Sequence, residues 1–307
     1  MQIDHIPVMK EEVLSFLIPT SPEPVMIDCT TGEGGHSEAF LQKYPGLTLY
    51  GLDRDESIRA KAIERLSVFG DRFHSVPCWF DEYLASAPDD FADMILFDLG
   101  ISVFHYVESG RGFSFRKDEK LDMRLDAGQS VSAETIVNEY PEKELADLIY
   151  KYSEERFSRR IAHRICCERA KARIETSAQL ADIVSQSVPS SYRYGRIHPA
   201  TRTFQALRIE VNGELDRITP ALEQATRVLK AGGRMAIITF HSLEDRIVKW
   251  FLKGRQADGQ LRILTKHPVV AGEEEDRLNP PSRSAKLRVA EKVFEGKEND
   301  NEKEIHA

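Results

Sequence analysis

Apolar residues in the first part of the chain form short runs, separated by segments with helical spacing. The runs predict strands over residues 25–29, 47–53, 73–76 and 94–98, and the segments between them predict helices over residues 37–41 and 57–69. The alternation returns near the end of the chain, with helices predicted over 214–229 and 243–252 and strands over 234–240, 261–264 and 287–294. Residues 273–281, acidic and rich in proline, are expected to form a loop. Strands that alternate with helices are typical of a mostly parallel sheet with right-handed crossovers.

The middle of the chain has a different pattern. Residues 111–212 contain helical stripes of apolar residues, such as Leu145, Leu148, Ile149 and Tyr152, and no convincing strand. Thr176 has the residue type of a helix N-cap. We therefore predict one α/β domain, residues 1–110 and 211–295, interrupted by an all-helical insertion over residues 111–210. Residues 296–307 are charged, lack apolar spacing and are predicted to be a disordered tail.

Composition narrows the class of protein. No apolar run approaches the roughly 18 residues that a membrane helix needs, so we expect no membrane partner. The first residues lack the basic and apolar regions of a secretory signal. None of the four cysteines forms a Cys-x-x-Cys pair, which favours a reduced, cytoplasmic setting.

The net charge of −8 conceals an asymmetry along the chain. Residues 1–110 hold 7 basic and 19 acidic side chains, a net of −12, whereas residues 156–208 hold 11 basic and 3 acidic ones, a net of +8. A basic segment in an acidic protein is the pattern expected of a local phosphate contact. The alternative is that these side chains are the solvated faces of helices.

A glycine-rich turn follows the first predicted strand. Glycines at Gly32, Gly34 and Gly35 would let the backbone pass close to a ligand, directly after Asp28. Asp53, at the end of the second predicted strand, has the position of a carboxylate that accepts both hydroxyl hydrogens of a ribose. Together these residues predict a cofactor that contains a nucleoside. A purely structural glycine turn is the alternative.

Two details distinguish between cofactors. A dinucleotide-binding turn favours Gly or Ala where this chain has Ser37, and Asp28 would lie poorly beside a pyrophosphate but well beside an ammonium group. The turn at residues 229–234 and the two late strands resemble those of class I methyltransferases, whose last strands form an antiparallel hairpin at the sheet edge. We therefore expect S-adenosylmethionine, with an NAD-dependent oxidoreductase as the alternative class.

Asp98 ends the fourth predicted strand. Groups at the carboxyl ends of parallel strands point into the ligand crevice, so Asp98 is expected near the methyl donor. An aspartate that merely caps the following turn is the alternative.

Longer motifs resemble the RsmH (MraW) family of bacterial methyltransferases. The resemblance extends over nearly the whole chain, and its motifs include residues 34–37, 53–55, 97–100, 111–115, 121–124, 155–157, 198–208, 240–246 and 283–288. It implies methylation of the N4 amino group of a cytidine in 16S rRNA of the small ribosomal subunit, a Rossmann-like class I fold, and an insertion that recognises RNA. It also implies cofactor contacts at Gly34, Gly35, His36, Asp53, Phe80 and Asp98. For Phe80, a core aromatic residue is the alternative to a ring that stacks on adenine.

The chain departs from this family beside the expected methyl donor. The family usually has Val-Ser-Ser-Pro-Gln where this chain has residues 101–105, Ile-Ser-Val-Phe-His, so His105 occupies a position that contacts the cofactor in the family. The first turn also has Asp28-Cys29-Thr30-Thr31 in place of the usual Asp-Gly-Thr. A divergent or non-catalytic rRNA-binding or assembly factor that keeps the fold is therefore the alternative function.

Methyl transfer to an amino group requires alignment of the acceptor and groups that accept its hydrogens. The candidates for this role are Asp98, Ser102 and His241. For His241 the alternative is a structural role, in which a loop carbonyl accepts a hydrogen bond from its ring. The candidates for binding rRNA phosphates are Arg156, Arg160, Arg202, Arg208, Arg283 and Arg288. The spacings match no zinc pattern, so no metal is expected. The oligomeric state is left open, with a homodimer among the alternatives.

Overall fold

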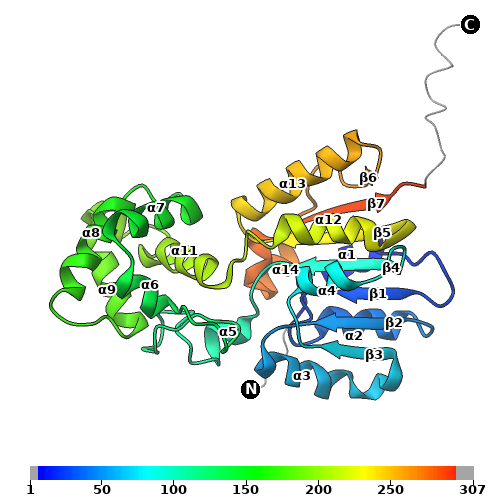
Figure 1. Cartoon of the computed structure of the whole chain (residues 1–307), viewed down its shortest axis with the longest axis horizontal. Coiled ribbons are helices and arrows are strands. Elements are labelled where there is room, and N and C mark those ends of the chain that lie inside the picture. Colours follow the sequence, from blue (N-terminus) through cyan, green and yellow to red (C-terminus); the bar gives the residue numbers. More distant parts are fainter. Residues whose placement is uncertain (1–5, 295–307) are drawn as a thin grey trace, which may run out of the picture. The chain divides into compact units, whose positions relative to one another are not determined.

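The computed structural model describes residues 6–294 and divides the chain into two compact units (Figure 1). One unit comprises residues up to Gly100 together with those from Ile218 onward, and the other comprises Ile101–Arg217. The sequence placed these divisions after residues 110 and 210. The structure places them differently because Ile101 and Leu215 pack against the apolar core of the second unit. The tail predicted over residues 296–307 lies outside the described residues.

The first unit is built on a seven-stranded sheet with the order β3-β2-β1-β4-β5-β7-β6. Its strands are β1 (Val25–Asp28), β2 (Thr48–Leu52), β3 (Phe73–Val76), β4 (Ala92–Asp98), β5 (Leu229–Thr239), β6 (Leu261–Ile263) and β7 (Lys286–Lys292). β1 to β5 pair in parallel, and β7 lies antiparallel between β5 and β6. The predicted class I methyltransferase fold, including its antiparallel hairpin at the edge, is confirmed.

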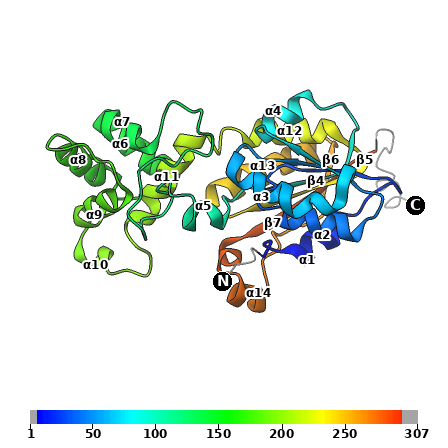
Figure 2. The same cartoon turned by 90° about the horizontal axis from the view of Figure 1, so that it is seen from below.

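Helices cover both faces of this sheet. They are α1 (Lys10–Phe16), α2 (Gly35–Lys43), α3 (Glu56–Leu66), α4 (Phe80–Ser86), α12 (Ile218–Val228), α13 (Ser242–Ala257) and α14 (Glu273–Leu278). Figure 2 shows strands between α4 and α12 on one side and α1 and α2 on the other. Because both faces are covered, six consecutive residues of β4 are buried, which explains its unbroken apolar run.

Several elements of this unit differ from the prediction, and α1 and α4 were not predicted at all. The acidic segment expected to be a loop contains α14, whose first turn holds four acidic residues, in agreement with the helix dipole. α12 begins at Ile218 rather than at residue 214. β5 begins at Leu229 rather than at residue 234, with a register shift against β4 where Gly232 adopts a positive φ of 77°.

The second unit is helical, and no strand occurs in its residues 101–217, all of which are described. Its helices are α5 (Val103–Val107), α6 (Ala133–Glu139), α7 (Glu142–Ser153), α8 (Ser158–Arg169), α9 (Ser177–Ser187), α10 (Ser190–Arg193) and α11 (Ala200–Asn212). Thr176 caps α9, as predicted: its hydroxyl accepts the N–H of Gln179, and the side chain of Gln179 accepts the N–H of Thr176 in a capping box. The predicted stripes of α7, α8 and α9 form one apolar core.

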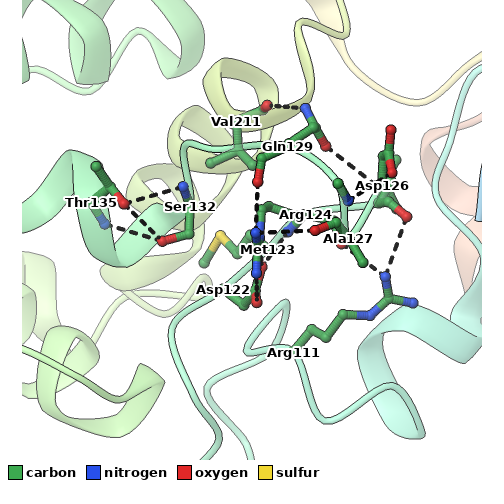
Figure 3. A network of polar contacts seen from close by, with 12 residues as sticks. Arg111, Asp122, Met123, Arg124, Asp126, Ala127, Gln129, Ser132, Thr135 and Val211 are labelled. Atoms are coloured by element: carbon green, nitrogen blue, oxygen red, sulfur yellow. Dashed lines mark hydrogen bonds and ion pairs between the residues drawn. The ribbon is translucent and has the colours of Figure 1, made fainter.

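Two arginines hold the irregular segment between α5 and α6 (Figure 3). Arg111 donates to the carbonyl oxygen of Arg124 (2.8 Å), and Arg124 pairs with Asp122 through two nitrogens (2.7 and 2.8 Å). Gln129 in turn donates to the carbonyl oxygen of Val211 in α11 (2.8 Å). Charged hydrogen bonds of this kind satisfy backbone groups that no regular element pairs. The motifs at residues 111–115 and 121–124 therefore have a structural role in this unit.

Among the described helices, none combines the length and the apolar composition required to cross a membrane.

Candidate cofactor site

Three carboxylates lie at one edge of the sheet. Asp28 and Asp98 end the adjacent strands β1 and β4, and Asp53 follows the other neighbour of β1, strand β2. The turn after β1 contacts both neighbours: the N–H of Gly32 donates to Oδ2 of Asp53 (3.1 Å), and the N–H of Asp98 donates to Oγ1 of Thr30 (2.7 Å). Parallel strands end at the same sheet edge, where ligands bind in open α/β folds. The structure thus brings together the three carboxylates that the sequence singled out.

The glycines of this turn are required by conformation and by space. Gly32 and Gly34 adopt positive φ values of 54° and 82°, which side chains other than glycine rarely adopt. A Cβ on Gly34 would lie 3.0 Å from Leu66, and one on Gly35 would lie 2.5 Å from Pro7. The structural reason for these glycines is therefore demonstrated. It is compatible with a role in cofactor binding, because the same compact turn exposes backbone at the sheet edge.

Asp28 and Asp53 are held by the turn itself. Ser37 donates to Oδ2 of Asp28 (2.6 Å) and the N–H of Thr30 donates to its Oδ1 (3.2 Å), while Asp53 accepts from the N–H groups of Gly32 and Asp55. Burial raises the pKa of Asp28 to about 6 and that of Asp53 to about 7, and the hydrogen bonds oppose this rise only in part. Ser37, which argued against a dinucleotide, thus also fixes the orientation of Asp28.

Asp98 has the most strongly raised pKa of the three carboxyl groups. Its side chain is 20% exposed, and its Oδ2 lies 3.8 Å from Nε2 of His36, a residue expected to contact the cofactor. Burial, followed by the negative charges of Asp28 and Glu244, raises the pKa of Asp98 to about 8. A cationic ligand beside Asp98 would reverse this effect.

The donor set fits S-adenosylmethionine. Among the described residues, no lysine or arginine forms an ion pair with Asp28, Asp53 or Asp98. When these carboxyl groups ionise, no basic side chain therefore compensates their negative charge. S-adenosylmethionine bears an ammonium and a sulfonium group and supplies a ribose for a carboxylate. A pyrophosphate, in contrast, would repel these three groups.

Phe80 lies at the start of α4, a helix that the sequence analysis did not predict. Its ring packs edge-on against the buried Phe97 with a centroid distance of 5.7 Å, yet the residue remains partly exposed. The contact with Phe97 agrees with Phe80 as a core aromatic residue. The partial exposure also leaves ring surface that could stack on adenine.

Ser102 and His105 belong to the helical unit and have local roles there. Oγ of Ser102 accepts the N–H of Phe104 and caps α5 (3.2 Å). His105 is 4% exposed and its ring packs against Phe113 with a centroid distance of 5.3 Å. Catalysis by Ser102 and cofactor contact by His105 therefore stay predictions.

His241 caps α13. Its Nδ1 accepts the N–H of Glu244 (3.4 Å), and Glu244, only 1% exposed, accepts the N–H groups of Phe240 (2.8 Å) and His241 (3.2 Å). These contacts give His241 a structural role that differs from the loop-carbonyl contact considered above, and its catalytic role stays a prediction. Glu244 was missed by the sequence analysis, although a glutamate three residues after a helix start is the signal of a capping box.

The six candidate arginines divide into two groups. Arg156, Arg160, Arg202 and Arg283 are exposed. Arg208 instead pairs with Glu214 (2.9 Å) and donates to the hydroxyl of Tyr106 (2.7 Å), and Arg288 is 8% exposed and pairs with Asp245 (2.8 Å). Arg208 and Arg288 are held by these short contacts and stabilise the fold, so the exposed four are the stronger candidates for contact with phosphate, although Arg202 also lies 3.9 Å from Glu155.

Comparison with known proteins supports one family. The model of the MraW methylase family matches residues 2–293. The chain is 53% identical to the ribosomal RNA small subunit methyltransferase H of Treponema denticola, with 95% of this chain and 98% of that protein covered. It is 48% identical to the protein of the same name from Borrelia turicatae (95% and 99% covered) and 46% identical to that from a Nostoc species (97% and 95% covered). The predicted methyltransferase class, with S-adenosylmethionine rather than NAD as cofactor, is confirmed, and the chain belongs to the MraW methylase family.

Proposed function

We propose that this protein transfers a methyl group from S-adenosylmethionine to the N4 amino group of a cytidine in 16S rRNA of the small ribosomal subunit. The observation on which this depends most is the set of three carboxylates, without a basic partner among the described residues, at the ends of β1, β2 and β4. The relatives' name, ribosomal RNA small subunit methyltransferase H, supports the substrate class.

The chain's own residues divide the work of binding the cofactor. Asp53 would accept the ribose hydroxyls, Asp28 and Asp98 would compensate the positive charges, and Phe80 would cover the adenine. When bound, S-adenosylmethionine supplies an electrophilic methyl group. The raised pKa of Asp98 means that this carboxyl is only partly ionised near neutral pH until a cation lies beside it, so its negative charge would develop more fully when the cationic cofactor is bound.

The acceptor amine needs orientation more than proton removal, because its lone pair is delocalised into the cytosine ring. Groups that accept its hydrogens would localise that pair. The candidates are the carboxylate of Asp98, the carbonyl groups of Leu99 to Ile101 and the hydroxyl of Ser102, with the imidazole of His241 as a further one. Much of the rate enhancement would then come from alignment of nitrogen and methyl group.

The helical unit would bind the rRNA. Arg156, Arg160 and Arg202 expose their guanidinium groups on this unit, and Arg283 does so on the other. The target base must leave its stack to reach the cofactor, so the arginines would hold the flanking phosphates. We place this reaction in the cytoplasm, where the four free cysteines remain reduced.

Transfer of radiolabelled methyl groups to undermethylated small subunits tests the proposal. We expect incorporation at one cytidine, identified as N4-methylcytidine after digestion to nucleosides. Asp98→Asn should lower the rate of methyl transfer by at least about 100-fold, because a small misplacement of the reacting groups costs about this much. Particles that bind the protein without incorporating label would favour the alternative of an assembly factor. Label in another nucleoside would contradict the assigned acceptor.

A further inference from the structure

The end of α10 and the turn after it display an aromatic ring between two arginines. We call residues 192–197, Tyr-Arg-Tyr-Gly-Arg-Ile, the tyrosine turn. Tyr194 is 83% exposed, more than any other large apolar or aromatic side chain described, and Ile197 is 58% exposed. A partner that covered this ring would remove its apolar surface from water, which is favourable.

The base of the tyrosine turn is fixed by a buried carboxylate. The hydroxyl of Tyr192 donates to Oε2 of Glu155 (2.5 Å), a residue with no exposed surface whose Oε1 accepts the N–H of Phe157 (2.8 Å). The rings of Tyr192 and Phe157 pack edge-on, and the guanidinium of Arg156 lies 5.2 Å from the centroid of the Tyr192 ring. Tyr192 therefore anchors the turn, whereas Tyr194 contributes nothing to this anchor. A fixed base lowers the entropy that the displayed ring loses on binding.

The arginines beside Tyr194 differ from several others in the helical unit. Arg164, Arg173 and Arg208 each pair with a glutamate of the same unit. Among the described residues, in contrast, none of the ion pairs includes Arg193 or Arg196, and Nε of Arg193 is buried without a hydrogen-bond partner. Arg156 and Arg202, both exposed, lie at the base of the turn, where Arg202 is 3.9 Å from Glu155. The turn thus combines one exposed ring with positive charge that is compensated only in part, by the contact between Arg202 and Glu155.

We propose that the tyrosine turn binds an unpaired nucleotide of RNA, with the ring of Tyr194 stacked on the base and Arg193 and Arg196 in contact with the neighbouring phosphates. Sites for single-stranded nucleic acid have this composition, because every base offers a π face and every linkage a negative charge. A base within a duplex has no free face for the ring. The inference rests on the proposed function for the identity of the RNA, but the chemistry of the turn selects for an unpaired strand by itself.

Binding of a fluorescein-labelled single-stranded RNA of 12 nucleotides, and of the same strand in a duplex, tests this inference with the full chain. We expect tighter binding of the single strand, and a loss of about tenfold or more for Tyr194→Ala, as removal of one stacking contact requires. Tyr194→Phe should retain the affinity. Arg193→Gln and Arg196→Gln should each lower the slope of log affinity against log salt by about 0.7, whereas Tyr194→Ala should leave this slope unchanged.

Tyr150→Ala is the matched control. Tyr150 is 60% exposed in the same unit, but its helix neighbours include Asp147 and Glu154, which suit no phosphate, so we expect no loss of affinity. Equal binding of single strand and duplex, or an unchanged affinity of Tyr194→Ala, would overturn the inference. If RNA binding persisted in that case, an acidic protein would become the favoured partner of the tyrosine turn. Methyl transfer by the wild-type protein is scored separately, so a failed turn and a failed proposed function give different results.

Discussion

Asp28, Asp53 and Asp98 are costly to ionise in the protein without its cofactor. Burial raises their pKa values to about 6, 7 and 8, whereas the ordinary value is 3.8. Between these limits the folded chain binds more protons than the unfolded chain, so the free energy of unfolding falls as pH rises. The contribution of these three groups to the free energy of unfolding is fully present below pH 3.8, and it is lost as pH rises through their pKa values in the folded protein. The same groups provide the negative charge that a cationic cofactor needs.

Asp98→Asn should therefore stabilise the cofactor-free protein at high pH. At pH 4 the protonated carboxyl resembles the amide, and the two proteins should unfold at similar urea concentrations. At pH 9 the wild type contains an ionised carboxylate in a desolvated site, and the variant should be more stable by at least about 1 kcal/mol, since one pKa unit corresponds to about 1.4 kcal/mol. Urea unfolding at pH 4, 7 and 9 provides the measurement.

Asp71→Asn controls for the removal of one negative charge from an acidic protein, because Asp71 is exposed on the same unit. The effect of Asp71→Asn on the free energy of unfolding is subtracted from that of Asp98→Asn at each pH. A difference between wild type and Asp98→Asn that does not change from pH 4 to pH 9 would show that the charge of Asp98 is well solvated.

At the scale of elements, the turn between β1 and α2 combines strict backbone demands with the candidate site. Gly34→Ala should destabilise the protein by about 2 kcal/mol, since a residue with a Cβ is strained at a φ of 82° and would contact Leu66 at 3.0 Å. Thermal and urea unfolding would measure this loss.

Gly254→Ala gives the opposite expectation and serves as the control. Gly254 lies inside α13 with open space around its Cα, so alanine should stabilise the protein by about 0.5–1 kcal/mol. If both variants were destabilised equally, the strain assigned to Gly34 would have no support.

The elements that could be predicted from sequence are those with a strong local signal. The buried strands and the helix at Thr176 were predicted because apolar runs and caps depend on neighbouring residues. α1, α4 and α14 were missed, because they are short and their apolar spacing is weak. The register shift at the start of β5 was also missed, since it depends on pairing with β4, which lies far away in the sequence.

The candidate site follows the same distinction. Asp28, Asp53 and Asp98 were found because strand ends in a parallel sheet meet at one edge. The roles of Arg208 and Arg288 were not foreseeable, because each depends on its carboxylate partner: Asp245, which pairs with Arg288, is 43 positions away in the sequence. Sequence alone identifies an arginine but not whether its charge is compensated.

At the scale of the whole molecule, the two units have different charge. Residues 101–217 hold 19 basic and 18 acidic side chains, a net of +1, and the remaining residues hold 23 and 32, a net of −9. The helical unit also encloses its own apolar core, with Ile161, Leu180 and Leu207 fully buried. A segment with an internal core of this kind has the properties of an independent folding domain.

We therefore expect residues 101–217, expressed alone, to unfold cooperatively and to bind the 12-nucleotide RNA. At 10 mM salt the screening length is about 30 Å, so the −9 charge of the remaining residues repels RNA from the full chain, and the fragment should bind more tightly. At 1 M salt this length is about 3 Å, and the difference between fragment and full chain should disappear. Circular dichroism and fluorescence anisotropy supply the two measurements. A fragment that folds but binds the RNA much more weakly than the full chain at every salt concentration would move the principal RNA contact to the sheet unit, where Arg283 is the exposed candidate, and would leave the basic side chains of residues 156–208 as solvated helix faces.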